Sequence, residues 1–423
     1  MRILLTGANG FIGRYLLAHL LSEGHIVIPA VRNPHETDRL LPRPASLHAD
    51  FNRDVTPEAW VPRLAGVDAV VNCAGVLQGS RGQSIAAIHT ETPKALFRAC
   101  EIAGVRRVIQ ISAISVGADT QYARTKLAAD EFLASTSLDW VILRPSLVYA
   151  EGAYGGTALF RALAASPFAV PLVGGGLQVF QPIHVSDLAA AVNKIVGGAA
   201  INRVIIEPVG PDSLTMREML IDLRRWLGLR EAPALPIPMP LVRLMAGVGD
   251  IVGGTISMTA LRQLEFGNAA PAEPFVAATG IHPQRWRDSL LAHPAQVQDR
   301  WHARLFFVRP LLRAAIGLTW IGSAISGIAN LSTLQGQFNA FGISLSTEAI
   351  WATCLVDLLV GIAVLARWRS GAIAVVQLII VAAYTLALSI AQPSLWLEPF
   401  GPLLKNIPFV VAVLALAALE PER

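Results

Sequence analysis

A tyrosine and a lysine stand four positions apart in the segment Tyr122-Ala123-Arg124-Thr125-Lys126. On a helix this spacing places the phenol and the ammonium on one face, so the two groups can act together. A nearby ammonium stabilises tyrosinate and is expected to lower the pKa of the phenol toward neutrality, where it becomes a usable general acid or base. The lysine can also hold a ribose hydroxyl. The pair therefore predicts proton transfer next to a bound nucleotide.

Three glycines, Gly7, Gly10 and Gly13, follow an apolar run at the start of the chain and precede a second apolar run, 15–21. This spacing allows a strand to turn sharply into a helix, lets a pyrophosphate approach the bare backbone, and lets the helix pack closely on a sheet. The free N–H groups and the dipole at the helix start favour negative charge. The segment predicts a dinucleotide-binding β-turn-α unit.

The elements that must position these residues alternate along the first 200 residues. Short apolar runs alternate with helical patterns, which predicts an α/β fold: a Rossmann-type, doubly wound parallel sheet. From about residue 210 the pattern becomes mainly helical, and we expect a small lobe there that closes over the substrate. The expected strands are 3–5, 25–30, 46–49, 69–72, 107–112, 140–143 and 203–207, and the expected helices are 15–22, 92–102 and 122–134.

The composition limits the classes of function. Of the 423 residues, 53% are hydrophobic, which is high for a soluble protein and suggests that part of the chain lies in a membrane. Cys73, Cys100 and Cys354 are scattered, so we expect neither a disulfide framework nor a zinc site, and no metal ligands are expected. The net charge of +4 comes without a basic run, and nucleic acid is not an expected partner. No signal peptide is expected.

The last 120 residues contain four apolar stretches, 311–331, 349–366, 371–391 and 403–419. Their lengths predict an all-α bundle of four transmembrane helices. Arginines flank the start of the first stretch and the junction of the second and third, whereas residues 332–348 contain neither lysine nor arginine. By the positive-inside rule, we expect a bacterial-type inner (plasma) membrane protein with the N-terminal domain and the C-terminus in the cytoplasm. The expected domains are 1–300 and 305–423.

Asp357 lies in the middle of the second stretch. A carboxylate at mid-bilayer costs about 2.5–3.5 kcal/mol on insertion scales, so it normally faces a partner or a polar cavity. The candidate partners are Arg313, Trp320, Gln377 and Lys405. Two interpretations stay open: a hydrogen bond that holds the bundle together, or a site for a proton or a quinone-like ligand.

Five motifs follow one another in order along residues 1–300. They are Thr6-Gly7-Ala8-Asn9-Gly10-Phe11-Ile12-Gly13, Val71-Asn72-Cys73-Ala74-Gly75, Tyr122 with Lys126, Arg144-Pro145-Ser146-Leu147-Val148-Tyr149, and Pro182-Ile183-His184-Val185-Ser186-Asp187-Leu188-Ala189. This set resembles the short-chain dehydrogenase/reductase superfamily, specifically its extended and atypical members. The resemblance implies that an NAD(P) cofactor contacts Gly7, Asn9, Gly10, Phe11, Ile12, Gly13, Asn72, Ala74, Gly75, Tyr122, Lys126, Pro145 and Ser146.

Arg32 stands just after the second expected strand, where members of this superfamily that bind NAD carry an acidic residue. A guanidinium there can instead meet a 2′-phosphate, so NADP(H) is the expected cofactor and NAD(H) the less favoured one. The resemblance also places Asp50 and Phe51 beside the adenine, with the carboxylate accepting a hydrogen bond from the exocyclic amine.

One position departs from the superfamily pattern. The residue that aligns with the catalytic serine is Ala113, so Ser112, or else Ser115, is the candidate to position the substrate oxygen. Loss of this serine is compatible with a fold that binds cofactor without turning it over. The chain is similar to NmrA-like regulators and to the NADPH-binding accessory subunit of respiratory complex I in its arginine after the second expected strand and in the compact Tyr122-Ala123-Arg124-Thr125-Lys126 segment. Residues 305–423 resemble a DoxX-like four-helix membrane domain.

The expected function is that of a membrane-anchored, NADP-preferring oxidoreductase acting on a carbonyl or alcohol of a lipophilic substrate. Tyr122 would donate or accept the proton, Lys126 would adjust the pKa of Tyr122, and Ser112 would position the substrate oxygen. Epimerase or dehydratase chemistry on a nucleotide sugar uses the same residues and stays open. The alternative from another class is an NADPH-binding sensor or assembly protein that docks onto a membrane or respiratory complex. A nucleotide-gated transporter ranks last.

Overall fold

The computed structural model describes residues 1–34, 45–79, 82–198, 200–252, 256–340, 342, 344, 346–399 and 401–420. The chain divides into two compact units, Met1–Ala303 and Arg304–Arg423. The first unit contains a large sheet covered by helices, together with a lobe of small sheets and helices. The second unit is helical in the part of it that the structure describes.

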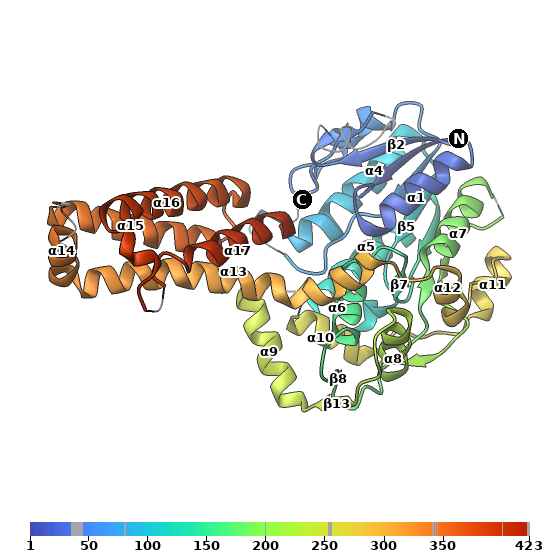
Figure 1. Ribbon diagram of the computed structural model, residues 1–423. Helices are drawn as coiled ribbons and strands as arrows, with labels where there is room; N and C mark the ends of the chain where they lie inside the picture. Colours follow the sequence, from blue (N-terminus) through green and yellow to red (C-terminus); the bar gives the residue numbers. More distant parts are fainter. Residues whose placement is uncertain are drawn as a thin grey trace. The chain divides into compact units, whose positions relative to one another are not determined.

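The first unit is built on a seven-stranded parallel sheet (Figure 1). The strand order is β11-β6-β5-β4-β1-β2-β3. Strands β2 and β3 lie on one side of β1 and β4 lies on the other, so the direction of the strand order reverses between β1 and β4. In such a sheet, ligands bind at the carboxyl ends of the strands at this reversal. The strands are β1 (Arg2–Thr6), β2 (Ile26–Val31), β3 (Leu47–His48), β4 (Ala69–Asn72), β5 (Arg107–Ile111), β6 (Asp139–Leu143) and β11 (Val204–Ile206).

Helices cover both faces of this sheet, which confirms the doubly wound arrangement expected from the sequence. One hydrophobic core joins the sheet to α1 (Phe11–Ser22), α7 (Val185–Gly197) and α11 (Glu273–Thr279). A second core lies on the opposite face and includes Trp60 and Leu133. That face is covered by α3 (Pro57–Trp60), α4 (Thr92–Ala103) and α5 (Gln121–Ala134), with the short helices η1 (Val61–Leu64), η2 (Ala87–Glu91) and η3 (Ile114–Gly117) between them.

The lobe is less purely helical than the sequence suggested, and it draws on residues before 210. Three two-stranded sheets pair segments far apart in the chain: β7 with β10, β8 with β13, and β9 with β12. These strands are too short for a two-residue period to be recognised in the sequence. Their bounds are β7 (Val148–Tyr149), β8 (Val170–Val173), β9 (Val179–Phe180), β10 (Ile183–His184), β12 (Leu214–Thr215) and β13 (Ala234–Ile237). The remaining helices are α6 (Gly155–Ala164), α8 (Met216–Trp226), α9 (Met239–Val252), α10 (Met258–Phe266) and α12 (Trp286–Ala292).

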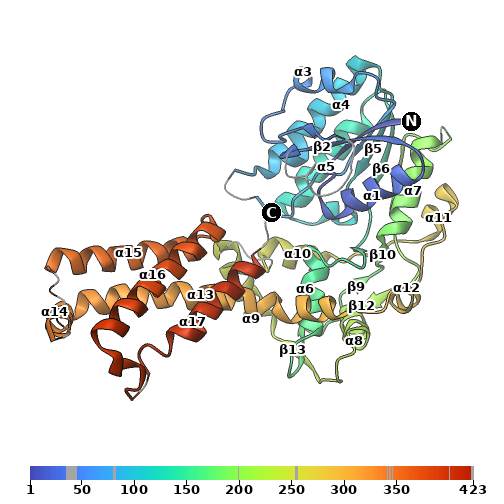
Figure 2. The ribbon, with the colours of Figure 1, turned by 45° about the horizontal axis from the view of Figure 1, so that its top comes forward.

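The second unit contains long apolar helices that run alongside one another (Figure 2). Three helices in the described chain are long and apolar enough to cross a membrane: α13 (Val297–Ala329), α15 (Thr347–Leu365) and α16 (Ser370–Ala391). The fourth expected span, 403–419, is a shorter apolar helix, α17 (Asn406–Leu419). Two further elements lie between the long helices, α14 (Leu331–Ala340) and η4 (Pro393–Trp396).

Small residues bring α13 and α15 into backbone contact. A Cβ atom built on Gly361 would lie 2.9 Å from the carbonyl oxygen of Gly317, and one built on Gly317 would lie 2.7 Å from the Leu365 side chain. Close approach at small residues is typical of helix pairs in membranes, where dispersion contacts replace the hydrophobic effect as the main attraction.

Candidate functional site

The glycine segment forms a sharp turn between β1 and α1. Gly7 has a φ of +65°, and a Cβ there would lie 2.7 Å from the carbonyl oxygen of Cys73 in the loop after β4. A Cβ on Gly13 would lie 2.1 Å from the Gly7 carbonyl oxygen. The turn therefore packs against the neighbouring loop and against its own helix. Helix α1 begins directly after Gly10, which has no side chain to occupy the first N–H groups, so these groups fit a phosphate.

A buried chain of side-chain hydrogen bonds links the carboxyl ends of three strands. The Thr6 hydroxyl donates to Asn72 Oδ1 (2.5 Å), and Asn72 Nδ2 donates to Gln110 Oε1 (2.7 Å). The Thr6 hydroxyl also accepts from the backbone N–H of Cys73 (3.2 Å). The side chain of Asn72, expected to contact the cofactor, is fully buried in this chain of bonds. It holds the loop that contains Ala74 and Gly75 beside the glycine turn.

Lys126 lies at the carboxyl end of the sheet, on α5. Its ammonium donates to the carbonyl oxygens of Ile111 (3.0 Å) and Ala74 (3.5 Å), and the residue is 4% exposed. Burial lowers its pKa, and the charge of Asp130 opposes this shift. A Cβ at position 75 would lie 3.3 Å from the ammonium nitrogen, so glycine keeps that side of the lysine open. Lys126 thus stands between the loops that follow β4 and β5.

Tyr122 lies one turn earlier on α5, whose start is capped by Thr120. Its ring meets the ring of His89 edge to face, with centroids 5.3 Å apart. Burial, reinforced by the charge of Asp130, raises the pKa of Tyr122 to about 12. The expected lowering of this pKa by Lys126 is therefore wrong for this structure, because burial and the negative charge of Asp130 both disfavour tyrosinate. The phenol is protonated at neutral pH.

Ser112 does not face an open site. It is 6% exposed, and its hydroxyl donates to Asp130 Oδ2 (2.8 Å), which also accepts from Arg144 Nε (3.0 Å). This geometry does not fit the expected role of Ser112 in positioning a substrate oxygen. Ser115, the other candidate, lies in η3 and is likewise buried. Asp130 and Arg144, which the sequence analysis did not single out, instead tie α5 to the end of β6.

His89 is a further residue that the sequence did not indicate, since no motif marks it. It lies in η2 with 1% exposure, and its Nε2 accepts a hydrogen bond from the N–H of Val76 (3.0 Å). Its proton therefore resides on Nδ1, which is 3.1 Å from the Thr125 hydroxyl oxygen. Burial, together with repulsion by the Lys126 ammonium, lowers the pKa of His89 to about 3. The ring is neutral and holds the loop after β4 against α5.

This depressed pKa predicts acid sensitivity. Because the folded pKa of His89 is about 3 and its ordinary value is 6.5, the unfolded chain binds more protons between these values. The contribution of neutral His89 to stability is complete above pH 6.5 and is lost as the pH falls toward 3. The His89→Gln variant should show a shallower loss of melting temperature between pH 7 and pH 5 than the wild type. His282→Gln, at an exposed position, is the control, and an unchanged slope in His89→Gln would contradict this assignment.

The residues expected around the adenosine lie near the ends of β2 and β3. Arg32 is exposed just after β2, and the residues 35–44 that follow lie outside the described part of the chain. Asp50 Oδ1 accepts from the N–H of Asn52 (3.0 Å), and its carboxylate is 3.7 Å from Arg53 Nε. The Phe51 ring meets Trp60 edge to face at 5.6 Å. The Asp50 carboxylate thus already stabilises its own turn.

The remaining expected cofactor residues line the turn after β6 and the start of α1. The Pro145 carbonyl oxygen accepts from the N–H of Ile114 (3.0 Å), and the Ser146 hydroxyl donates to the carbonyl oxygen of Gln181. The Asn9 carbonyl oxygen accepts from Arg14 Nε (3.0 Å). At the start of α1, the Phe11 ring stacks on Tyr154, and Ile12 packs against the core. The structure therefore places these residues on the loops at the carboxyl side of the sheet.

Comparison with known proteins identifies the two parts of the chain. Residues 7–166 match a family model described as NAD(P)H-binding, and residues 314–414 match the DoxX-like family. The chain joins an NAD(P)-binding Rossmann-type domain to a DoxX-like domain. Both resemblances expected from the sequence are confirmed. The DoxX-like match and the apolar helices support a membrane protein.

Relatives and solved structures support the NAD(P)-binding Rossmann-type assignment of the first domain. Over 268 residues, the chain is 30% identical to the mitochondrial NADH dehydrogenase [ubiquinone] 1 alpha subcomplex subunit 9 of Arabidopsis thaliana, covering 58% of this chain and 62% of that protein. Over 239 residues, it is 26% identical to a ceramide reductase of Caulobacter vibrioides, covering 54% and 71% respectively. The structure of MoeE5 in complex with UDP-glucose and NAD shares the fold, with a TM-score of 0.53 at 22% identity, covering 72% of this chain and all of that one.

Asp357, in the DoxX-like domain, is 7% exposed. Its Oδ2 accepts from the Ser323 hydroxyl on α13 (2.8 Å), whereas Oδ1 lacks a hydrogen-bond partner in the described part of the chain. The partners expected from the sequence are wrong: Arg313 pairs with Glu420, and Trp320 Nε1 donates to Gln377 Oε1 (2.9 Å). The sequence does not indicate Ser323 as the partner, because a small hydroxyl residue in an apolar helix carries no charge.

Proposed function

We propose that the protein is a membrane-anchored NAD(P)(H)-dependent oxidoreductase that transfers hydride to or from a carbonyl or alcohol carbon of a lipophilic substrate. The observation that carries this proposal is the position of Lys126 on α5, with its ammonium between the carbonyl oxygens of Ala74 and Ile111. This places the lysine and the preceding Tyr122 at the edge of the sheet where the order reverses, beside the glycine turn.

Each group at this edge of the sheet has a separate role in the proposed reaction. When bound, a nicotinamide dinucleotide supplies or accepts the hydride. The open N–H groups at the start of α1 bind its phosphates, and Lys126 holds a ribose hydroxyl. Tyr122 donates the proton to the substrate oxygen during reduction, since its pKa of about 12 keeps the phenol protonated. Ala113 has no hydroxyl and that of Ser112 is donated to Asp130, so in this proposal Tyr122 supplies the hydrogen bond to that oxygen.

The lipophilic substrate class follows from tethering to a bilayer by the DoxX-like domain, and it agrees with the ceramide reductase relative. The arginines that flank the apolar helices support an orientation with the N-terminal domain and the C-terminus in the cytoplasm. Epimerisation or dehydration of a nucleotide sugar would use the same tyrosine and lysine, and it is the competing reaction to test.

The decisive experiment uses detergent-purified full-length protein titrated with NADPH and NADH while nicotinamide fluorescence is followed. Long-chain aldehydes, ketones, quinones and nucleotide sugars are then added, and the absorbance of the bound reduced cofactor is recorded. Oxidation by a lipophilic carbonyl supports the proposal. Conversion of a nucleotide sugar without net oxidation of the cofactor would favour an epimerase or dehydratase over an oxidoreductase. Absence of binding to NADPH and NADH would refute both functions.

A preference for NADP(H) is proposed from Arg32, whose guanidinium stands exposed after β2. A hydrogen bond between charged groups contributes about 1.5–3 kcal/mol, so Arg32→Glu should weaken NADPH binding about 10- to 100-fold and leave NADH binding nearly unchanged. Titration of both nucleotides measures the ratio of affinities. Arg230→Glu makes the same charge reversal at an exposed position in the lobe and should leave the ratio as in the wild type. An equal loss for NADPH and NADH in Arg32→Glu would contradict the preference.

A second candidate function is a non-catalytic NADPH-binding subunit or assembly protein of a membrane complex. The observation that favours it is the absence of a free hydroxyl where the superfamily carries its catalytic serine, since Ser112 is hydrogen-bonded to Asp130. The similarity to subunit 9 of a respiratory NADH dehydrogenase points the same way. Tight NADPH binding without oxidation by any substrate, together with co-purification of a stoichiometric membrane partner, would favour this function.

A further inference from the structure

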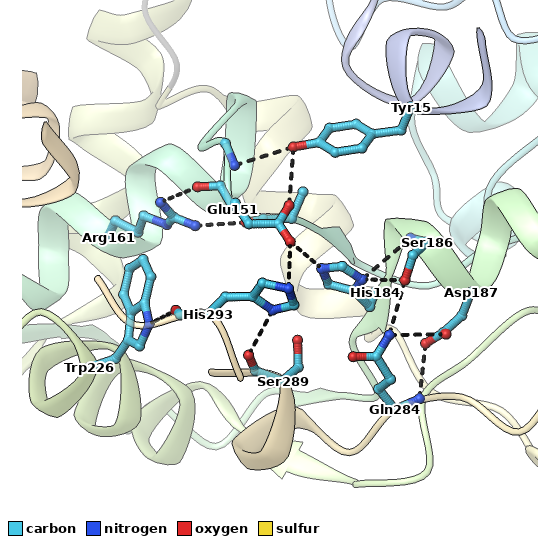
Figure 3. A network of polar contacts seen from close by, with 12 residues as sticks. Tyr15, Glu151, Arg161, His184, Ser186, Asp187, Trp226, Gln284, Ser289 and His293 are labelled. Carbon is cyan, nitrogen blue, oxygen red and sulfur yellow. Dashed lines mark hydrogen bonds and ion pairs between the residues drawn. The ribbon is translucent and has the colours of Figure 1, made fainter. Parts of the chain in front are cut away.

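A second cluster of titratable side chains lies in the first unit, outside the tyrosine–lysine edge. Glu151, His184 and His293 bring one ligand atom each to within 4.8 Å of one another. Glu151 follows β7, His184 ends β10 just before α7, and His293 follows α12. Figure 3 shows both imidazole rings directed at the Glu151 carboxylate. Three segments far apart in the sequence thus meet at one point.

The distances fit a single small cation. Glu151 Oε1 is 3.5 Å from His184 Nε2 and 3.2 Å from His293 Nε2. Zinc binds histidine nitrogen and carboxylate oxygen at about 2.0–2.2 Å with tetrahedral geometry, which separates neighbouring ligand atoms by about 3.4 Å. These two distances are close to this separation, and the two histidine nitrogens lie within 4.8 Å of each other.

The position of the His293 proton points to a cation between the rings and the carboxylate. His293 Nδ1 lies 3.1 Å from the carbonyl oxygen of Ser289, which can only accept, so Nδ1 carries the proton. In the neutral ring, Nε2 therefore directs a lone pair at Glu151 Oε1, which is also an acceptor. Two acceptors 3.2 Å apart require a positive charge between them. Either an additional proton or a metal ion supplies it.

The ring of His184 is held in place by contacts at its Nδ1. The residue is 4% exposed, and its Nδ1 lies 2.6 Å from the Ser186 hydroxyl oxygen. Nδ1 also accepts from the backbone N–H of Ser186 (3.4 Å), so metal binding at Nε2 requires the ring proton to move to Nδ1, where the Ser186 hydroxyl oxygen can accept it. The Ser186 hydroxyl oxygen also accepts from Gln284 Nε2 (3.0 Å), and the Gln284 N–H donates to Asp187 (2.9 Å). The ring is thus oriented by a network of hydrogen bonds.

Other groups around the cluster leave the ligand atoms available. The guanidinium of Arg161 donates to the carbonyl oxygens of Glu151 and Ala150, and it pairs with Asp299. The Tyr15 hydroxyl donates to the other carboxylate oxygen, Oε2, at 3.4 Å. The side chains of Glu151 and His293 are each less than half exposed, so a fourth coordination position opens toward solvent.

We propose that Glu151, His184 and His293 form a binding site for a Zn²⁺-class divalent cation, with water at the fourth position. Bound metal joins the end of α12 to the start of α7 and to the segment after β7, which fastens part of the lobe to the sheet domain. This site is independent of the proposed oxidoreductase activity.

The test uses full-length protein in detergent, with any affinity tag removed and metals stripped by a chelator. Co²⁺ is titrated while its visible d–d absorption is recorded, and Zn²⁺ is then added as a competitor. One Co²⁺ per chain with the intense bands of four-coordinate geometry is expected, and Zn²⁺ should displace it. Zn²⁺ should also raise the melting temperature, because a ligand that binds only the folded state stabilises it.

The ligand variants are Glu151→Gln and His293→Gln, which change partly exposed side chains and spare the buried His184 at the start of α7. Each should weaken Co²⁺ binding at least about tenfold. His282→Gln removes an exposed histidine elsewhere in the same unit and should bind Co²⁺ as the wild type does. Absence of the d–d bands in the wild type, or equal affinity in the wild type and both ligand variants, would overturn the proposal and leave a proton as the shared cation.

Discussion

Replacing Tyr122 with phenylalanine should lower the rate of hydride transfer by about 10²–10⁴-fold, the usual contribution of a positioned general acid or base. NADPH affinity should change little, because the ring and its edge-to-face contact with His89 stay in place. Tyr384→Phe, the same deletion of a hydroxyl in the DoxX-like domain, is the matched control. Single-turnover oxidation of bound NADPH measures the effect. Equal rates in the wild type and Tyr122→Phe would remove Tyr122 from the mechanism.

The raised pKa of Tyr122 also predicts which direction of the reaction is favoured at neutral pH. With a pKa of about 12, the phenol is already protonated across the neutral range and can donate to a substrate oxygen without a change of state. Carbonyl reduction should therefore be nearly independent of pH around neutrality. Alcohol oxidation, which needs the tyrosinate as base, should accelerate as the pH rises. The burial of this group thus favours a reductase over a dehydrogenase at neutral pH.

The second large effect is expected at Gly13. Alanine there would place its Cβ 2.1 Å from the Gly7 carbonyl oxygen, so the turn and the helix must separate. Overpacking of this kind destabilises by about 1–3 kcal/mol, and more when backbone must move. The start of α1 would no longer face the dinucleotide phosphates. We expect Gly13→Ala to lower the melting temperature and to weaken NADPH and NADH binding together.

Gly197→Ala is the matched control, since it also adds one methyl group to a helical glycine. No atom lies within 4 Å of a Cβ at position 197, so alanine fits there, and it should slightly stabilise the protein. Melting temperature and nucleotide affinity measure both variants. Wild-type binding by Gly13→Ala would show that the close contact of turn and helix is not needed for the cofactor.

Local patterns in the sequence predicted the strands of the large sheet and three of its helices, α1, α4 and α5. The glycine spacing, the alternation of apolar runs and helical patterns, and the four apolar stretches depend on near neighbours in the chain. For the same reason, the Tyr122–Lys126 pair could be placed on one helix face before its surroundings were known. The short strands β8, β9, β12 and β13 were not predicted because each is too short for a two-residue period to be recognised. Their pairing partners also lie far away in the sequence.

Only the tertiary structure decided the state of the chemical groups. The sequence predicted that Lys126 would lower the pKa of Tyr122, but burial raises it, and burial depends on how α5 packs. Ser112 stood near the right position in the alignment, yet Asp130, from the facing helix, accepts its hydrogen bond. His89 and the cluster of Glu151, His184 and His293 carry no local motif. Their pKa shifts, proton positions and distances arise from segments that meet only when the chain folds, which no spacing along the sequence encodes.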